Sequence, residues 1–343
     1  MVHAKVLKLA LNDYGSYLGC EKGCFTVKDR HGNVKRYPMF EDEIGSVELR
    51  SGNAVSTGAL ASLGFWNIDC LILTQRGRPV AMLKSLDDDS NVQTRISQYE
   101  ALSNGKSSVI AKEFLIAKLK GQNEVLKKCG LRRFDFTVFE TIKKLEAGNL
   151  AMLRRKMLAI EGKCSTSYFN SIFGLFNESV KPSKRRTFKA YNGLNNLFNL
   201  AYEMLAWKIH IALVKAKLEP YLGFLHSLKF GTPSLVCDFL ELYRYLIDDF
   251  VIEFGRKLKP NDFIVKDEDF SKHRKGKRQY LNTKQTGEFT KALNNLFQHE
   301  VEIPRIMRGK RQELETLINE EALLFAKYLR NERQGWTPRI PKI

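Results

Sequence analysis

Cysteine is scarce in this chain of 343 residues, and long apolar runs are missing from it. The six cysteines are too sparse for a disulfide framework and lack the paired spacing of zinc ligands, so we expect reduced thiols in a cytoplasmic protein. No stretch of the sequence approaches the roughly 18 uninterrupted apolar residues of a membrane span. The N-terminus also reaches polar residues after one short apolar run. We therefore expect neither secretion nor a membrane partner.

Acidic side chains are outnumbered by basic ones, 38 to 56, which gives a formal net charge of +18. The excess is uneven, because residues 1–95 carry 12 basic and 11 acidic side chains and the rest of the chain carries 44 and 27. Charge concentrated in one part of a chain indicates a surface that faces a polyanion, and nucleic-acid phosphate is the commonest one. A soluble helical surface rich in lysine is the alternative.

Hydrophobic residues make up 43% of the chain, which excludes wholesale disorder, and the length is typical of two domains. The first part alternates apolar and polar residues and contains turn residues, so it predicts short strands. We expect them at 5–9, 24–27, 34–37, 46–49 and 69–74, with a turn at 29–33. Ser56 or Thr57 can cap a short helix over 58–63. This predicts a small β-rich domain with one helix.

A polar run at 85–91 marks the boundary, and we divide the chain into domains at 1–88 and 89–343. Three consecutive aspartates at 87–89 could bind metal, but a solvated linker that caps the next helix explains them better. From Val92 onward apolar residues recur at three and four residue spacing, as in 114–126 and 201–213, which predicts a helix bundle.

Two basic stretches, 181–189 and 259–279, interrupt the helical pattern and are predicted to be loops. The second is dense enough in positive charge to neutralise phosphate. Its candidate DNA contacts are Lys272, Arg274, Lys275, Lys277 and Arg278. Solvated, mobile loops are the plainer explanation for both stretches.

Four residues place carboxylate or imidazole groups in apolar surroundings within this basic domain. Glu161 follows an apolar helical run, where an unpaired buried charge would cost several kcal/mol. His226 ends an apolar turn that contains glycine. Thr232-Pro233 can open a helix, on which Asp238 and Glu241 stand three residues apart and share one face.

Two or three carboxylates with one neutral imidazole form a hard ligand set, which suits Mn²⁺ or Mg²⁺ and phosphodiester chemistry. Each residue also has a simpler explanation. His226 could be a hydrogen-bonded core histidine, Glu161 could pair with a lysine, and Asp238 and Glu241 could lie on a helix surface near its N-terminal dipole.

At these residues the sequence resembles the CRISPR-associated protein one family, the universal integrases of CRISPR spacer acquisition. The strings that carry the resemblance occur in the family's order and are 160–162 followed by 168–169, 195–202, 223–227 and 233–244. The segment 49–60 is similar to the family's β-domain. The likeness therefore covers nearly the whole chain.

The resemblance implies an α+β protein, with an N-terminal small β-sandwich-like domain that forms a homodimer and a larger all-α C-terminal catalytic bundle. It also implies that Glu161 and His226 bind the catalytic Mg²⁺ or Mn²⁺. The third ligand falls on the turn from Asp238 to Glu241, and we favour Glu241 as ligand and Asp238 as a supporting acid. A second dimeric protein, CRISPR-associated protein two, is the implied partner.

Two departures from the family pattern stand out. The family usually has an arginine between its glutamate-glycine pair and the tyrosine, where this chain has Cys164-Ser165-Thr166-Ser167. A typical Asp-Pro pair before the asparagine is replaced by Asn192-Gly193. The first change removes a DNA-contacting charge and puts the rate of catalysis in question.

We therefore expect a metal-dependent integrase that inserts short DNA fragments into a repeat array by transesterification. The alternatives are a structure-selective nuclease on branched DNA and a catalytically silent subunit that only binds nucleic acid. Lys229 and Arg244 are candidates for phosphate contacts, or for ordinary salt bridges. His226 must be neutral to bind metal, so activity should fall below a pH of about 6.5.

Overall fold

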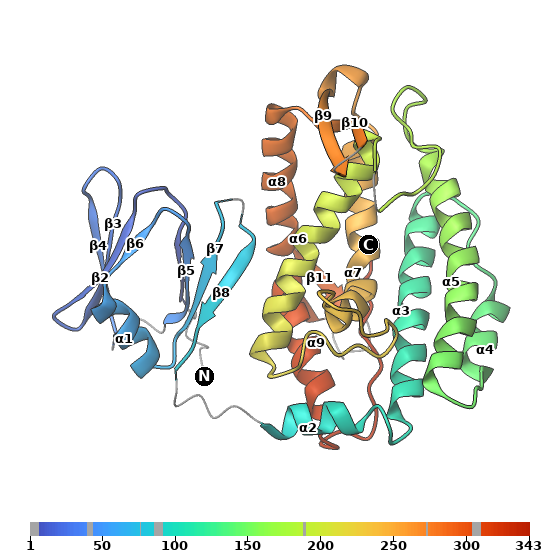
Figure 1. The fold of residues 1–343 in the computed structure, drawn as a ribbon, viewed down its shortest axis with the longest axis horizontal. Coiled ribbons are helices and arrows are strands. Elements are labelled where there is room, and N and C mark those ends of the chain that lie inside the picture. Colours follow the sequence, from blue (N-terminus) through green and yellow to red (C-terminus); the bar gives the residue numbers. More distant parts are fainter. Residues whose placement is uncertain are drawn as a thin grey trace. The chain divides into compact units, whose positions relative to one another are not determined.

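The structure is a computed structural model, which describes residues 7–39, 44–75, 77–85, 92–187, 190–271, 274–303 and 310–343 (Figure 1). The chain divides into two compact units, Met1–Ser90 and Asn91–Ile343. The boundary lies two residues beyond the one placed from the sequence. The aspartate run at 87–89 lies outside the described residues.

The N-terminal unit contains two four-stranded sheets. In the first, the order is β1 (Leu7–Leu11), β5 (Ile44–Arg50), β7 (Asp69–Leu73) and β8 (Pro79–Leu83). In the second, the order is β4 (Val34–Pro38), β3 (Cys24–Lys28), β2 (Tyr17–Glu21) and β6 (Ala54–Val55). Their alternating apolar residues, including Leu18, Phe25 and Val47, are fully buried in one core. The sandwich-like expectation is confirmed, and the strands β2, β6 and β8 are additions to it.

A short helix, α1 (Thr57–Phe65), belongs to the same unit. Ser56 caps it, because its Oγ accepts a hydrogen bond from the backbone N–H of Ala59 at 3.1 Å. The cap satisfies one of the backbone donors that every helix start leaves unpaired. Of the two caps considered from the sequence, Ser56 is therefore the one used.

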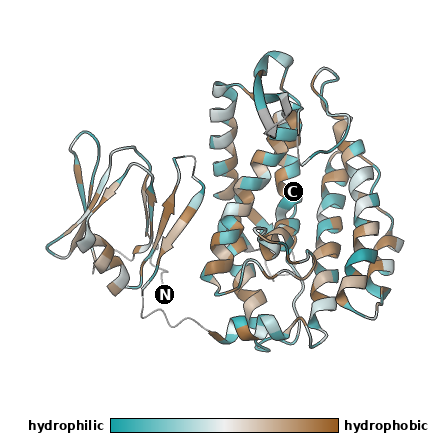
Figure 2. Ribbon diagram, in the orientation of Figure 1, coloured by the Kyte–Doolittle hydropathy of each residue, from teal (hydrophilic) through white to brown (hydrophobic). Residues whose placement is uncertain are grey.

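The C-terminal unit is mainly helical. Its helices are α2 (Val92–Glu100), α3 (Lys106–Lys128), α4 (Phe136–Lys144), α5 (Leu150–Phe173), α6 (Gly193–Lys215), α7 (Ser234–Gly255), α8 (Thr283–Phe297) and α9 (Leu314–Leu329). Apolar and polar residues alternate along them (Figure 2), as expected where each helix buries one stripe. The mixed α+β class predicted from the sequence is confirmed.

Helix α7 lies in the core of this unit, packed against both α3 and α6. Gly121 permits the close approach of α3, since a Cβ at that position would stand 2.3 Å from the ring of Tyr245. Helix α6 is long and apolar enough to span a membrane by length and composition. However, half of the apolar stretch is buried inside the protein.

The prediction of an all-α C-terminal domain is wrong in one respect, because this unit contains two antiparallel strand pairs. They are β9 (Phe263–Ser271) with β10 (Arg274–Leu281), and β11 (Glu300–Ile303) with β12 (Lys310–Glu313). The first pair also corrects the predicted loop over 259–279. Two acids on β9 stand opposite lysines on β10, Asp267 opposite Lys277 and Asp269 opposite Lys275. Opposite charges across a ladder stabilise a hairpin, so the charge density that suggested a solvated loop suits paired strands equally well.

Candidate functional site

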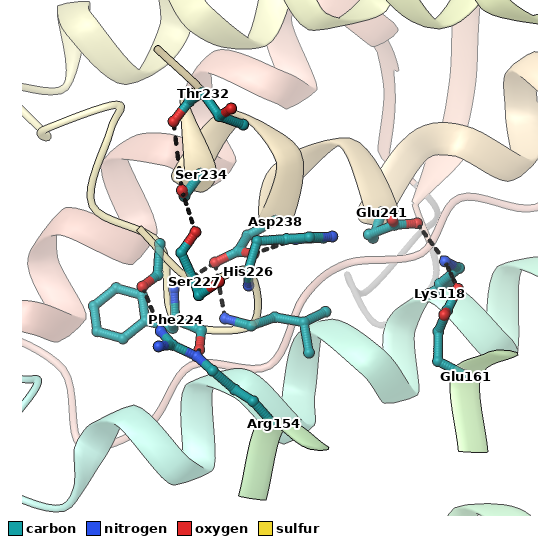
Figure 3. A network of polar contacts seen from close by, with 12 residues as sticks. Lys118, Arg154, Glu161, Phe224, His226, Ser227, Thr232, Ser234, Asp238 and Glu241 are labelled. Carbon is teal, nitrogen blue, oxygen red and sulfur yellow. Dashed lines mark hydrogen bonds and ion pairs between the residues drawn. The ribbon is translucent and has the colours of Figure 1, made fainter. Parts of the chain in front are cut away.

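Helices α3 and α5 bring Lys118 and Glu161 together. The Lys118 Nζ lies 2.5 Å from Glu161 Oε1 (Figure 3). Ser165, one turn further along α5, donates its hydroxyl to the same oxygen at 2.8 Å. The Lys118 side chain is only 6% exposed. This pairing offsets the cost of placing Glu161 after an apolar helical run. Ser165 belongs to the segment that stands where the family usually has an arginine, so the local contact is a hydroxyl instead of a charge.

Glu241 on α7 is the second carboxylate beside Lys118, with its Oε2 3.1 Å from Nζ. Its side chain is 3% exposed, and Oε1 lies 3.4 Å from Nη2 of Arg244. Burial raises the pKa of this carboxyl, but the charges of Arg244, Lys118 and His226 outweigh burial and hold the pKa below its usual value. Glu241 is therefore ionised, yet Oε2 has no partner with hydrogen-bond geometry. Attraction by charge alone leaves this buried oxygen available to a stronger cation.

His226 lies on the loop before α7 and is held by Asp238. Its Nδ1 is 2.7 Å from Asp238 Oδ1. Burial lowers the pKa of the imidazole, but the hydrogen bond and charge of Asp238 and the charge of Glu241 together raise the pKa above 6.5. An imidazole held through Nδ1 keeps Nε2 as its free nitrogen, which is the arrangement of many histidine ligands whose other nitrogen bonds a carboxylate.

Asp238 is fully buried and holds the whole loop that carries His226. Its Oδ2 accepts the backbone N–H groups of Phe224 at 2.6 Å and Leu225 at 3.0 Å, and its Oδ1 accepts that of His226 at 2.8 Å. These three bonds and the ring contact occupy both oxygens. Asp238 therefore fixes backbone and imidazole, while Glu241, one helical turn later, reaches the pocket.

Two further features close the loop around Asp238. Arg154 of α5 donates from Nε to the Phe224 carbonyl at 2.7 Å and from Nη2 to the Gly223 carbonyl at 2.8 Å. Gly223 passes so close to the start of α7 that a Cβ there would lie 2.8 Å from backbone atoms of Ser234. The loop is thus held from both sides by contacts that tolerate little displacement.

A pocket of about 180 Å³ gathers these groups. Its lining residues are Lys118, Leu158, Glu161, Leu225, His226, Glu241 and Arg244. The three ligands expected from the sequence therefore share one pocket, although they come from α5, a loop and α7. In the parts of the chain that are described, no group of three or more His, Cys, Asp or Glu side chains stands close enough to hold an ion without movement. Lys118 stands between two of the three.

The predicted DNA contacts are dispersed. Lys229 is exposed in the turn that follows His226, and Arg244 lines the pocket. On β10, Lys277 is exposed, whereas Arg278 forms an ion pair with Glu268 at 3.1 Å. Lys272 lies outside the described residues, and only the backbone of Arg274 and Lys275 is described.

A buried network behind Arg244 was not anticipated from the sequence. The guanidinium of Arg244 lies 4.7 Å from the ring centroid of Tyr202, whose hydroxyl donates to Asp248. Tyr168 donates to the other oxygen of Asp248 at 2.9 Å, and Arg185 packs on the same Tyr202 ring at 5.3 Å. Burial is the main reason that the pKa of Asp248 rises to about 6. This network therefore supports Arg244, which lines the pocket.

Sequence reasoning also missed Lys118 and Arg154. Lys118 is a charge in the apolar run 114–119, which is the same signal that singled out Glu161. Only acids were singled out by this signal, although it holds equally for a buried base. Arg154 shows no such signal in the sequence, because its partners are backbone carbonyls that only the tertiary structure brings near.

The protein has a β-rich unit and a helical unit, and the helical unit contains a pocket with two carboxylates and one imidazole. These features define its class, a two-unit protein with a candidate site for a hard metal ion. The family model described as "CRISPR associated protein Cas1" matches residues 9–294. The chain therefore belongs to the Cas1 family.

Relatives and solved structures agree with this assignment. The chain is 28% identical over 262 residues to the CRISPR-associated endonuclease Cas1 2 of Pyrobaculum aerophilum, covering 76% of this chain and 86% of that protein. A casposase bound to integration product has a TM-score of 0.70 at 19% identity and covers 98% of this chain and 94% of its own. A partial Cas6-RT-Cas1–Cas2 complex has a TM-score of 0.71 at 19% identity, with coverage of 98% and 99%.

Proposed function

We propose that the protein is a divalent-metal-dependent DNA integrase and endonuclease of CRISPR adaptation. It inserts short DNA fragments into a repeat array by transesterification. The single observation that carries the proposal is the pairing of Glu161 and Glu241 about one buried cation, the ammonium of Lys118, in a pocket shared with His226. Because these two carboxylates already bind one positive charge between them, they are positioned to bind a metal ion.

The donor set fits Mg²⁺ or Mn²⁺. Glu241 Oε2 is a buried oxygen without a hydrogen bond, and Asp238 fixes Nδ1 of His226 so that Nε2 is the nitrogen left to bind. Glu161, His226 and Glu241 would hold the ion, and Asp238 would act as the supporting acid. The ion would supply polarisation of the phosphodiester and stabilisation of charge on its oxygens.

The remaining tasks fall to the chain itself. The loop fixed by Asp238 and Arg154 keeps His226 in one orientation. Lys229 and Arg244 would bind phosphates of the DNA, because phosphate contacts fix the position of DNA without reading its sequence. The 3′-hydroxyl of the incoming strand would then attack a phosphorus of the repeat, with both reactants held in place. The new P–O bond replaces the bond to the 3′-oxygen of the repeat strand, and the proton lost by the attacking hydroxyl is balanced by one taken up by the departing 3′-oxygen.

A strand-transfer assay tests the proposal. Labelled DNA fragments are incubated with a repeat-containing target in Mg²⁺ or Mn²⁺, using the native protein and the variants Glu161→Ala, His226→Ala and Glu241→Ala. We expect each variant to lose at least about a hundredfold in rate, the order typical for groups that stabilise transition-state charge. Glu178→Ala is the matched control, because Glu178 is an 81% exposed acid that pairs with Lys181.

The products separate the proposed function from its rivals. Joined strands indicate integration, whereas shortened strands alone would indicate a structure-selective nuclease that uses water in the same pocket. A silent DNA-binding subunit would leave every activity unchanged by Glu161→Ala. In that case Mn²⁺ would not raise the melting temperature.

We further propose that the protein works in the cytoplasm as a homodimer formed through its N-terminal unit, with Cas2 as partner. Among the structures that share its fold, a Cas1–Cas2 complex supports this partner, and a casposase bound to integration product supports DNA. Size-exclusion chromatography with light scattering, alone and with a Cas2 protein, checks both associations. A protein that stays monomeric and does not bind Cas2 would contradict both associations.

A further inference from the structure

Lys118 is the buried cation at the centre of the pocket, and the reaction proposed above does not require it. We propose that Lys118 is an internal counterion that competes with the divalent metal. Its ammonium pairs Glu161 with Glu241 in the metal-free protein and leaves that position when the metal binds. The proposal rests on the metal site described under the proposed function and adds a residue that sets its affinity.

The burial of Lys118 shows that the side chain is built into the site. It is 6% exposed, and its Nζ lies 2.5 Å from Glu161 and 3.1 Å from Glu241 (Figure 3). A lysine is almost never this buried unless it is paired, and here both partners are expected metal ligands. The three residues come from three helices, α3, α5 and α7, so the ion pairs join the three walls of the pocket.

Geometry makes the ammonium and a metal ion mutually exclusive. A Mg²⁺ ion lies about 2.0–2.1 Å from each oxygen that binds it. An ion bound to Glu161 Oε1 and Glu241 Oε2 would therefore occupy the space between these oxygens where Nζ now stands. Two cations at this distance also repel each other strongly in a buried site. The flexible side chain of Lys118 lines the pocket of about 180 Å³, so it can turn aside within that pocket.

The counterion has a separate benefit for the metal-free protein. Without Lys118, Glu161 and Glu241 would be neighbouring like charges, and Glu241 is 3% exposed. Arg244 would remain as a base beside Glu241, at 3.4 Å. Lys118 therefore stabilises the fold before metal arrives and lowers the metal affinity that the acids would otherwise have.

The first test compares the full-length native protein with Lys118→Met, which keeps the length of the side chain and removes its charge. We expect the variant to melt at a lower temperature in EDTA, and to bind Mn²⁺ at least about tenfold more tightly by isothermal titration calorimetry at pH 8. Lys128→Met is the matched control. Lys128 is on the same helix and also pairs with α7, through Asp249 and Glu253, but it does not line the pocket. The control should lower the melting temperature without changing the Mn²⁺ affinity.

A second measurement needs no variant, so it remains decisive if Lys118→Met fails to fold. Acylation of lysines in the native protein is followed by peptide mass spectrometry, with and without Mn²⁺. We expect Lys118 to be protected in EDTA and to react several times faster when Mn²⁺ is bound. Lys128 should react at the same rate with and without Mn²⁺.

The outcomes separate this inference from the metal site itself. Suppose that the native protein binds Mn²⁺, but Lys118→Met binds it no more tightly, or Lys118 stays protected from acylation when Mn²⁺ is bound. Either result would overturn the role of Lys118 as a counterion and leave the metal site intact. No Mn²⁺ binding by either protein would overturn both. Tighter binding by Lys118→Met together with metal-dependent labelling of Lys118 establishes the counterion.

Discussion

Asp238 binds His226 twice, through the backbone N–H at 2.8 Å and through the ring Nδ1 at 2.7 Å, both at the same carboxylate oxygen. One buried acid therefore fixes both the position of the loop and the orientation of the imidazole. The acid and the imidazole are 12 residues apart in the sequence. This relationship makes the proposed ligand dependent on a residue that binds no metal.

Replacement of Asp238 by asparagine tests this dependence. An amide NH₂ would face backbone donors, so we expect Asp238→Asn to lower the free energy of unfolding by about 2 kcal/mol or more and to reduce strand transfer sharply. Asp249→Asn is the control on the same helix, since Asp249 pairs with the partly exposed Lys128 and should cost under about 1 kcal/mol. Chemical denaturation and the transfer assay measure both effects. Equal losses in the two variants would contradict the role of Asp238.

The pH dependence of metal binding should reflect His226. The folded protein holds the pKa of this imidazole above 6.5, and only the neutral ring binds metal. We therefore expect Mn²⁺ affinity to begin to fall at a pH above 6.5, higher than a free histidine would give, and to fall about tenfold per pH unit below the pKa. Calorimetric titrations between pH 6 and 8 measure this slope. His226→Ala should bind weakly and lack the histidine component of the slope.

Gly223→Ala should disturb the site without touching any ligand. The new methyl group would lie 2.8 Å from backbone atoms of Ser234, so the loop that carries His226 must shift. We expect lower stability and a large loss of strand transfer. Gly162→Ala is the control beside Glu161, because nothing lies within 4 Å of its Cβ position and alanine favours a helix by about 1 kcal/mol. Full activity of Gly223→Ala would show that the loop tolerates displacement.

The basic residues should differ in their contribution to DNA binding. Lys229 is exposed in the turn that follows His226, whereas Arg278 is already paired with Glu268 at 3.1 Å. We expect Lys229→Ala to reduce the salt slope of DNA affinity by about 1, as for the loss of one phosphate contact. Arg278→Ala should change the slope little. Fluorescence anisotropy over a range of salt concentrations measures both, and a reversed order would contradict the assignment.

The buried carboxyl of Asp248 predicts a pH effect on stability. Its pKa rises from 3.8 to about 6 on folding, so it favours the folded state most at low pH, and that contribution is lost as pH rises through about 6. The shift corresponds to about 3 kcal/mol. Asp248→Asn has no such titration, so its stability relative to the native protein should rise by up to this amount between pH 4 and 8. A constant difference across this range would contradict the buried, titrating acid.

The sequence predicted the strands β1, β3, β4, β5 and β7 because period-two patterns depend on neighbours in the chain. Spacing of three and four residues, which also depends on neighbours, predicted the helical segments within α3 and α6. The β9–β10 hairpin was missed because its ladder pairs residues such as Asp267 and Lys277, whose charges look like a solvated loop until the partner strand is known. The order of the strands in each sheet was likewise beyond local patterns.

For the site, the sequence by itself singled out the acids and the imidazole as candidates, since charge after an apolar run and an i, i+3 pair are visible without a fold. Only the tertiary structure distinguished the contacts of the two acids on α7. In the folded protein, Asp238 accepts hydrogen bonds from three backbone N–H groups, whereas Glu241 forms an ion pair with Lys118. The tertiary structure also placed Lys118 between two acids that are 80 residues apart in the sequence. Contacts between distant segments arise from the packing of α3, α5 and α7, and no local pattern encodes which side chains that packing brings together.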